Sequence, residues 1–155
     1  MENIDPNAAW LETFRKTSHY QTLRKRPVAY FCAEFALSDN LPIYAGGLGV
    51  LAADIIREAS DRNLPMVGIG LYYHEGYVCQ TLDKDGATKE ESNMTWPADV
   101  GLVPVMDRKQ QRIIIDIPIQ DRIVHAQAWK WQHGSVPVFL LDTDTLENDT
   151  SDRKI

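Results

Sequence analysis

The sequence predicts an α/β fold that begins with a strand–helix–strand unit. Residues 28–33 and 66–71 are short apolar runs, and residues 48–62 between them repeat apolar side chains at helical spacing. A glycine-rich turn stands directly before the helix, as in doubly wound domains that bind nucleotides or sugar phosphates. Together these features predict one right-handed βαβ unit of a parallel sheet.

The helix of this unit has a clear amphipathic pattern. Its expected core-facing residues recur three and four positions apart, at Leu48, Leu51, Ala52, Ile55, Ile56 and Ala59. Asn63 follows at a position that suits a helix C-cap, and Pro65 prevents the helix from continuing. Residues 28–33 are apolar throughout, which predicts a central parallel strand that is covered on both faces.

Residues 1–25 are predicted to form an N-terminal helical extension that packs on the domain surface. Pro6 suits a first helical turn. The apolar face of this helix would carry Trp10, Leu11, Phe14 and Thr17. The basic run at residues 24–26 is expected to end the helix and to stay solvated. Residues 26–155 are then expected to form an incomplete α/β domain.

The second half of the chain has the pattern of a β-rich meander. Further strands are expected at residues 76–82, 103–106, 112–117, 123–131 and 136–141, the last of which returns to the parallel sheet. Residues 83–86 predict a hairpin turn, and residues 120–122 separate the strands of a second hairpin. Residues 89–99 are polar and are expected to be irregular. Pro118 and Pro137 predict strand edges or strand starts.

Composition and charge exclude several classes of protein. The 155 residues are 44% hydrophobic and 25% charged, which is ordinary for a globular domain with a core. A net charge of -6 argues against nucleic-acid or anionic-membrane partners, since neither attracts an acidic chain. The sequence contains neither a signal-peptide pattern nor a long apolar span. Cys32 and Cys79 are expected to be buried thiols in a reducing compartment, so a cytoplasmic location is expected.

Gly46, Gly47 and Gly49 form the main candidate site. Glycines permit positive φ angles and let a ligand approach the backbone closely. The first N–H groups of the following helix, near Leu48, lack partners within the helix, and the helix dipole favours an anion there. The same glycines also suit a turn that only lets the strand and the helix pack closely. The local pattern supports both interpretations equally.

Three further candidates follow the other expected parallel strands. In open α/β sheets, ligands bind beyond the carboxyl ends of the strands, where Glu34, His74 and Asp142 stand. Glu34 could accept hydrogen bonds from a ligand, or it could only anchor its loop. His74 could bind an anion, although a lone histidine beside tyrosines is more often structural. Trp129 and Trp131 share a strand face, where packing is favoured over stacking on sugar. No histidine or cysteine spacing is typical of a metal site.

Several segments, in this order, resemble one enzyme family. They are Val-Ala-Tyr-Phe-Cys-Ala-Glu-Phe at 28–35, Leu-Pro-Ile-Tyr-Ala-Gly-Gly-Leu-Gly at 41–49, Glu-Ala-Ser-Asp at 58–61 and Leu-Pro-Met-Val-Gly-Ile-Gly-Leu-Tyr at 64–72. Residues 140–144 and 147–148 also fit. From about Arg26 onward, the chain resembles the N-terminal portion of α-glucan phosphorylases (glycogen, maltodextrin and starch phosphorylases). It is most similar to the shorter bacterial and archaeal members.

The resemblance implies a partial doubly wound domain of the GT-B type. The complete enzyme would transfer a terminal α-1,4-glucosyl unit of a glucan to phosphate and give glucose 1-phosphate. Glu34 would lie in the active-site wall, and Gly47, Leu48 and Gly49 would face the substrate phosphate and the donor-site sugar. The family often carries an arginine where His74 stands, which weakens an anion-binding role for this residue.

The resemblance also implies partners and a cofactor. The partners would be α-1,4-glucan, inorganic phosphate and a second domain. That second domain would carry the lysine that holds pyridoxal phosphate, so this chain alone is expected to be inactive.

Two alternatives remain open. A glycogen-synthase-like transferase that uses a sugar nucleotide shares the glycine turn. However, Tyr44 and Ala45 stand where that family usually has a lysine before the glycines. The other alternative is a non-catalytic product of a truncated or split gene.

Overall fold

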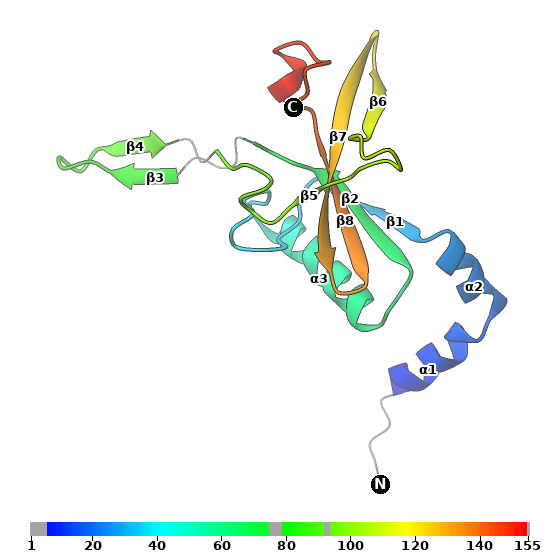
Figure 1. Cartoon of the computed structure of the whole chain (residues 1–155). Helices are drawn as coiled ribbons and strands as arrows, with labels where there is room; N and C mark the ends of the chain where they lie inside the picture. The colour runs from blue at the N-terminus through cyan, green and yellow to red at the C-terminus, as the bar shows by residue number, and fades with distance from the viewer. Residues whose placement is uncertain (1–5, 75–78, 92–93, 155) are drawn as a thin grey trace.

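The computed structural model describes residues 6–74, 79–91 and 94–154 and shows an α/β fold (Figure 1). Among these residues the main sheet has six strands. β1 (Val28–Phe31), β2 (Met66–Leu71), β8 (Val136–Asp142), β7 (Arg122–His133) and β5 (Val103–Pro104) lie side by side in this order, and β6 (Ile114–Ile119) also pairs with β7. α3 (Gly47–Asp61) packs against β2, β8 and β7. The predicted α/β class is confirmed.

β1, β2 and β8 form the parallel part of the sheet. Tyr30 lies opposite Gly68 in the register of β1 and β2, and Gly68 lies opposite Val138 in that of β2 and β8. With α3 between β1 and β2 in the chain, these elements confirm the predicted βαβ unit and the later return to the parallel sheet. β7 runs antiparallel to β8, so the complete sheet is mixed.

β1 lies at the edge of the sheet and not in its centre. Among the described residues it pairs only with β2, and Val28 and Phe31 are 44% and 71% exposed. The prediction of a strand that is covered on both faces is therefore wrong. An unbroken apolar run favours a strand, but it does not determine how many neighbours that strand has.

The core lies between α3 and the sheet. Its buried side chains from α3 are those of Ala52, Ala53, Ile56 and Ala59. Gly68 permits a close approach, since a Cβ atom there would lie 3.2 Å from Ile56 Cδ1 and 3.0 Å from Val138 Cγ2. Leu48 and Leu51, which are predicted to face the core, are exposed instead. The helix turns its alanines and Ile56 toward the sheet and leaves these two leucines at the surface.

Asn63 ends the helix as predicted and directly follows the C-cap residue, Arg62. Asn63 has φ 48°, in the left-handed region. The N–H of Leu64 donates to the carbonyl of Ala59 over 2.8 Å, which is the hydrogen bond of a Schellman motif. The helix therefore ends where its pattern predicts.

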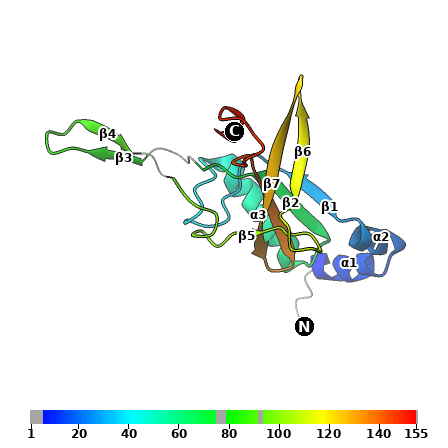
Figure 2. The ribbon, with the colours of Figure 1, turned by 45° about the horizontal axis from the view of Figure 1, so that its top comes forward.

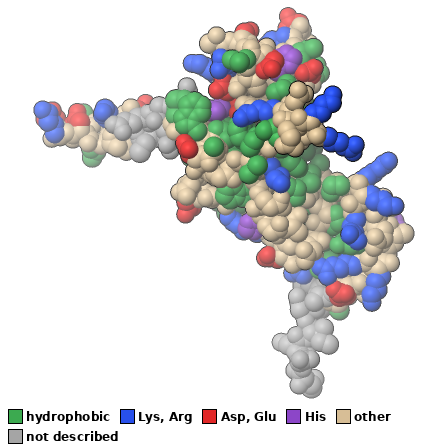
Figure 3. All heavy atoms as spheres, in the orientation of Figure 1, with side chains coloured by type: hydrophobic (Ala, Val, Ile, Leu, Met, Phe, Trp, Pro, Cys, Tyr) green, Lys and Arg blue, Asp and Glu red, His purple; other side chains and the backbone are tan. Residues whose placement is uncertain are grey.

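The N-terminal extension forms two helices, α1 (Pro6–Arg15) and α2 (Ser18–Lys25), and not one continuous helix. Thr17 caps α2, since its hydroxyl accepts the N–H of Tyr20 over 3.2 Å. Both helices hold the end of α3. Arg15 donates to the carbonyl of Arg62 over 2.8 Å, and the Tyr20 hydroxyl donates to the carbonyl of Asn63 over 3.1 Å. Figure 3 shows Lys and Arg side chains gathered over this extension.

Two hairpins follow in the second half of the chain. β6 and β7 are joined through Gln120, which has φ 55°, and this confirms the second predicted hairpin. β3 (Cys79–Leu82) and β4 (Thr88–Glu91) form a separate sheet that projects from the rest of the protein in both views (Figures 1 and 2). β4 overlaps residues 89–99, so the prediction of irregular structure is wrong there. Residues 76–78 of the predicted strand lie outside the described residues.

The prolines agree with their predicted places, whereas one cysteine does not. Pro118 lies in β6, which pairs on one side only within the described chain, and Pro137 is the second residue of β8. Cys32 is half-buried and not buried, because it directly follows the edge strand β1. The side chain of Cys79 lies outside the described residues.

We expect Gly134→Ala to destabilise the turn between β7 and β8. Gly134 has φ 51°, and a Cβ atom there would overlap Ser60 Oγ. That oxygen accepts the N–H of Ser135 over 3.1 Å. Left-handed strain and the loss of this hydrogen bond should together lower the free energy of unfolding by about 2–4 kcal/mol, measured by urea denaturation.

The matched control is Gly86→Ala. Gly86 has φ 82° but has nothing within 4 Å of a Cβ atom, so this variant adds backbone strain alone and should cost roughly 1 kcal/mol. Equal costs for the two variants would contradict the contact between Gly134 and Ser60.

Candidate functional site

The carboxyl ends of the three parallel strands lie at one edge of the sheet, and the segments after them are joined by hydrogen bonds. The N–H of Tyr72 donates to the carbonyl of Leu141 over 2.8 Å. The Tyr73 hydroxyl donates to the carbonyl of Ala33 over 3.1 Å. We call this edge the rim. It comprises residues 33–36, 46–49, 72–74 and 142–144, and such an edge is where open α/β sheets bind ligands.

The glycine turn forms the N-terminus of α3. Gly46 is the N-cap residue with φ −160°, and Gly47 is the first helical residue. None of Gly46, Gly47 and Gly49 has a positive φ angle, so the freedom that glycine gives there is not used by the backbone of this turn. A Cβ atom at Gly46 or Gly47 would have nothing within 4 Å, whereas one at Gly49 would lie 2.5 Å from Tyr44 Cβ. Gly49 therefore serves packing, while Gly46, Gly47 and the exposed Leu48 leave the helix end open.

Glu34 lies beside this turn. Its Oε2 accepts the N–H of Ala45 over 3.4 Å, and the N–H of Ala36 donates to the carbonyl of Gly49 over 3.0 Å. The carboxylate thus anchors the loop, and its charge lies near the positive end of the α3 dipole. Since like charges repel, Glu34 suits the hydroxyl groups of a ligand better than a phosphate.

Asp142 is buried at the rim, where its side chain is 1% exposed and forms hydrogen bonds to several segments. Its Oδ2 accepts from Gln127 Nε2 and Trp129 Nε1, both over 2.8 Å. Its Oδ1 accepts the N–H of Asp144 over 2.9 Å and lies 2.9 Å from His74 Nε2. Three of these four neighbours can only donate. The carboxylate is therefore the acceptor throughout, and Nε2 of His74 carries a hydrogen.

His74 is held by Asp142 and by aromatic rings. The rings of Tyr72 and Trp96 meet the imidazole edge-on, with centroid distances of 4.8 Å and 5.9 Å. His74 Nδ1 has no hydrogen-bond partner among the described residues. Burial raises the pKa of the Tyr72 hydroxyl, which also hydrogen-bonds to Thr95, so Tyr72 stays neutral at physiological pH. These contacts fit the structural interpretation of His74.

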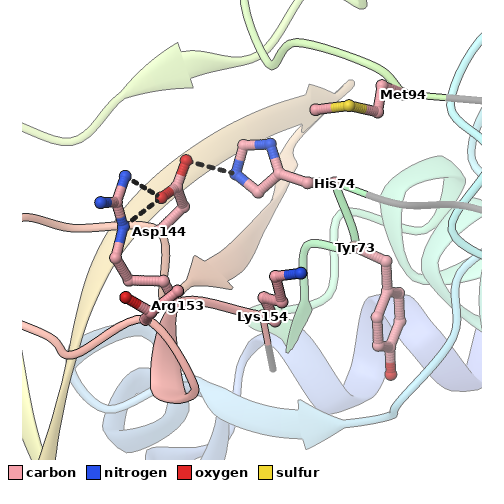
Figure 4. Close-up of a pocket in the computed structure, with 7 residues that line it drawn as sticks. Tyr73, His74, Met94, Asp144, Arg153 and Lys154 are labelled. Carbon is pink, nitrogen blue, oxygen red and sulfur yellow. Dashed lines mark hydrogen bonds and ion pairs between the residues drawn. The ribbon is translucent and has the colours of Figure 1, made fainter.

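A pocket of about 250 Å³ opens beside His74. Figure 4 shows Tyr73 and His74 on one side of it and Asp144 and Arg153 on the other. Arg153 Nε lies 2.7 Å from Asp144 Oδ1, and His74 Nε2 lies 4.0 Å from Asp144 Oδ2. Asp144 thus pairs with the guanidinium of Arg153, and Lys154 also lines this pocket.

The C-terminal tail is fastened to β7 and so brings Arg153 to the rim. Asn148 Oδ1 accepts the N–H of His125 over 2.8 Å, and Asn148 Nδ2 donates to the carbonyl of His125 over 2.6 Å. The 3₁₀-helix η1 (Asp152–Lys154) follows. Its buried Asp152 forms an ion pair with Arg122, whose Nη2 lies 2.9 Å from Oδ1.

We expect this tail to loosen in acid. Asp149 Oδ1 accepts the N–H of Asp152 over 3.0 Å and the hydroxyl of Ser151 over 2.7 Å. These hydrogen bonds lower the pKa of Asp149 below its ordinary value. The stability that Asp149 contributes is fully present above the unfolded-state pKa of about 4 and is lost as the pH falls through the lowered folded-state pKa. NMR amide signals of Ser151 and Asp152 should move in that range.

The control for this titration is Asp149→Asn, which retains an acceptor but does not titrate. The acid step at Ser151 and Asp152 should then be absent. A step that persists unchanged would assign the titration to another carboxylate.

The sequence predicts His74 and Asp142 at the same edge of the sheet but predicts neither their hydrogen bond nor the ion pair of Asp144 and Arg153. The sequence of β7 does indicate the surroundings of Asp142. Gln127 and Trp129 stand two positions apart in this strand, so their side chains lie on the same face. Trp129 is buried in the core, as predicted.

The described residues, 6–74, 79–91 and 94–154, contain neither of two further features. No group of three or more histidine, cysteine, aspartate or glutamate side chains there could hold a metal ion. Within the same part of the chain, no helix has the length and apolar character needed to cross a membrane.

Together, the fold and the rim define an α/β domain with an open helix N-terminus beside carboxylate and aromatic side chains, which suits an oxygen-rich ligand. No family model matches the chain. The chain is 40% identical over 152 residues to the maltodextrin phosphorylase of Thermococcus litoralis. This alignment covers 98% of the chain and 18% of that protein. The chain is 36% identical over 129 residues to the glycogen phosphorylase of Mycobacterium tuberculosis, covering 83% and 15% of the two chains.

A third relative agrees with these two. The glycogen phosphorylase of Aquifex aeolicus is 33% identical over 138 residues, which are 89% of this chain and 20% of that protein. These three curated relatives, which match most of this chain at 33–40% identity, are thus maltodextrin and glycogen phosphorylases. The chain spans between 15% and 20% of the length of these three relatives.

Proposed function

We propose that this chain is the N-terminal portion of an α-glucan phosphorylase, which transfers a terminal α-1,4-glucosyl unit to phosphate and gives glucose 1-phosphate. The observation that carries the proposal is the 40% identity to a maltodextrin phosphorylase across 98% of the chain. An alignment of this extent includes the whole rim and not only the glycine turn. The partners would be α-1,4-glucan, inorganic phosphate and the remainder of the enzyme, in the cytoplasm.

The rim residues would have two different roles. The backbone N–H groups near Gly47, Leu48 and Gly49 would face the substrate phosphate, because the helix N-terminus attracts an anion and Gly47 leaves room for it. Glu34 would accept hydrogen bonds from sugar hydroxyls. Asp142 and His74 would position the rim without touching the substrate, since Asp142 is buried and holds His74 through Nε2.

The GT-B arrangement of two doubly wound domains is part of this proposal. The active site would then lie between the rim of this domain and a second domain. The open rim and the exposed apolar side chains of Leu48 and Leu51 near it support such a neighbour.

The family resemblance implies pyridoxal phosphate, and the described residues do not form a site for it. The lysine at the rim pocket, Lys154, lies beside the paired Arg153 and Asp144 in a space of about 250 Å³. The open glycines of the turn do not line this pocket. We therefore assign the cofactor lysine to the second domain of the complete enzyme.

A chimera tests this function. This chain would replace the matching segment of the Thermococcus litoralis maltodextrin phosphorylase, and release of glucose 1-phosphate from maltodextrin and phosphate would be measured. We expect the chimera to be active and the isolated chain to be inactive. A chimera that folds and retains its cofactor but releases no glucose 1-phosphate would contradict the proposal.

A further inference from the structure

The short segment that carries Glu34 is fastened at several of its residues. The carbonyl of Ala33 accepts the Tyr73 hydroxyl over 3.1 Å. The side chain of Phe35 is fully buried and belongs to the main core cluster. The residues on either side of Glu34 are thus fixed to the rest of the domain, and they determine where its carboxylate can lie.

Ala36, at the end of this segment, is bound to α3 through both of its backbone groups. Its N–H donates to the carbonyl of Gly49 over 3.0 Å, and its carbonyl accepts from Arg57 Nη2 over 2.9 Å. Gly49 and Arg57 are eight residues apart on α3, which is about 12 Å along the helix axis. Helical side chains lean toward the N-terminus, so Arg57 can reach back to this segment.

The guanidinium of Arg57 is held in place from a second side. Its Nη1 donates to Asp54 Oδ1 over 2.9 Å, while Nη2 binds the carbonyl of Ala36. The Arg57 side chain is 43% exposed and lies outside the core cluster. Removing the guanidinium would therefore release the carbonyl of Ala36 without opening the core.

Glu34 lies within a side-chain length of the N-terminus of α3. A Cβ atom at Gly49 would lie 3.4 Å from Glu34 Cβ. Glu34 Oε2 accepts the N–H of Ala45, which precedes the N-cap residue Gly46, over 3.4 Å. This contact is longer than the usual range of about 2.7–3.2 Å, and it lies outside the first turn of the helix. A carboxylate is attracted to the positive end of a helix dipole, so a small movement of the segment would bring it over that end.

We propose that Arg57 is a positioning residue that holds Glu34 beside the end of α3, so that the first N–H groups of the helix stay open to a phosphate. This inference rests on the proposed function. Without the guanidinium, the segment relaxes, and the carboxylate of Glu34 moves onto the helix end as an internal competitor of the anion. Arg57 thus acts through Glu34 and contacts neither the phosphate nor the sugar.

The variant Arg57→Met in the active chimera tests this role. We expect the KM for inorganic phosphate to rise roughly threefold to tenfold. The kcat at saturating phosphate should be nearly retained, because excess phosphate displaces an internal competitor. Arg57→Lys keeps the charge but lacks the planar pair of donors, so the rise should be smaller. Arg62→Met is the matched control, since Arg62 lies on the same helix and pairs with Glu58, and it should leave this KM unchanged.

Glu34→Gln distinguishes positioning from a general structural effect. An amide carries no charge with which to compete against phosphate, so adding Arg57→Met to the Glu34→Gln variant should no longer raise the KM. Such a double-mutant cycle measures the coupling of the two residues. The isolated chain supplies a readout without activity. Its NMR amide signals of Gly47 and Leu48 should shift in Arg57→Met, and Glu34→Gln should remove most of this shift.

Four outcomes would overturn the role of Arg57. They are an equal rise of the phosphate KM with and without Glu34→Gln, a fall in kcat without a rise in KM, an effect of the same size in Arg62→Met, and unchanged amide signals of Gly47 and Leu48 in Arg57→Met. An inactive chimera with the expected amide shifts in the isolated chain would refute only the proposed function. An active chimera in which Arg57→Met leaves the phosphate KM unchanged would refute only this inference.

Discussion

Asp142→Asn is expected to destabilise the protein strongly, although it preserves the shape of the side chain. The two carboxylate oxygens of Asp142 each meet two donors, which come from His74, Gln127, Trp129 and the backbone of Asp144. An asparagine has one acceptor atom, so its NH₂ group would face at least one donor that cannot accept: Gln127 and Trp129 in one orientation, or the N–H of Asp144 beside His74 in the other. Each buried donor without a partner costs about 1–3 kcal/mol. With one or two such donors, we expect a loss of roughly 1–6 kcal/mol in the free energy of unfolding, measured by urea denaturation.

Asp144→Asn is the matched control, because it makes the same chemical change two positions away. The Asp144 side chain is 28% exposed and pairs with a partly exposed Arg153. Such pairs contribute about 1 kcal/mol or less, so this variant should be only slightly destabilised. Similar losses of unfolding free energy for the two variants would contradict the claim that the four hydrogen bonds of Asp142 stabilise the rim.

Gly47→Val, introduced into the active chimera, is expected to cut turnover far more than stability. Gly47 is helical and nothing lies within 4 Å of a Cβ atom placed there, so the valine should fit the folded protein. Its branched side chain would occupy the space beside the first N–H groups of α3. Loss of one backbone donor to developing charge typically lowers a rate by about 10²–10³. The measurement compares glucose 1-phosphate release with the melting temperature.

Two further variants serve as comparisons for Gly47→Val. Gly49→Val should lower the melting temperature first, because its Cβ atom would collide with Tyr44. Glu34→Gln should reduce turnover less than Gly47→Val, since it keeps the shape of the side chain and removes only its charge. Near-normal turnover in folded Gly47→Val would leave the proposed phosphate contact without support.

The features that depend on neighbouring residues in the chain could be predicted from the sequence. The period of α3, its end at Asn63 and the hairpin at Gln120 each arise within a few residues. The place of β1 could not be predicted in this way, because an edge strand and a central strand can have the same apolar pattern. Only the pairing of the whole sheet distinguishes them, and that pairing is set by residues far away in the chain.

The same limit applies to the rim. The rule for open sheets places His74 and Asp142 at one edge, but their hydrogen bond depends on the register of β2 against β8. Gly47 and Gly49 are indistinguishable as residue types, and only the position of Tyr44 separates the open glycine from the packed one. Backbone angles at the turn likewise follow from where the helix begins, which a glycine count does not reveal.

The tail has a consequence for association between copies of the protein. On the side of β7 that faces β8, strand pairing stops at Gln127 among the described residues. Beyond that point, the amide of Asn148 bonds to both the N–H and the carbonyl of His125, as a residue of a neighbouring strand would. An uncovered edge is a template on which a second molecule can add a strand and begin to aggregate. One side chain thus blocks an intermolecular β-sheet at this edge.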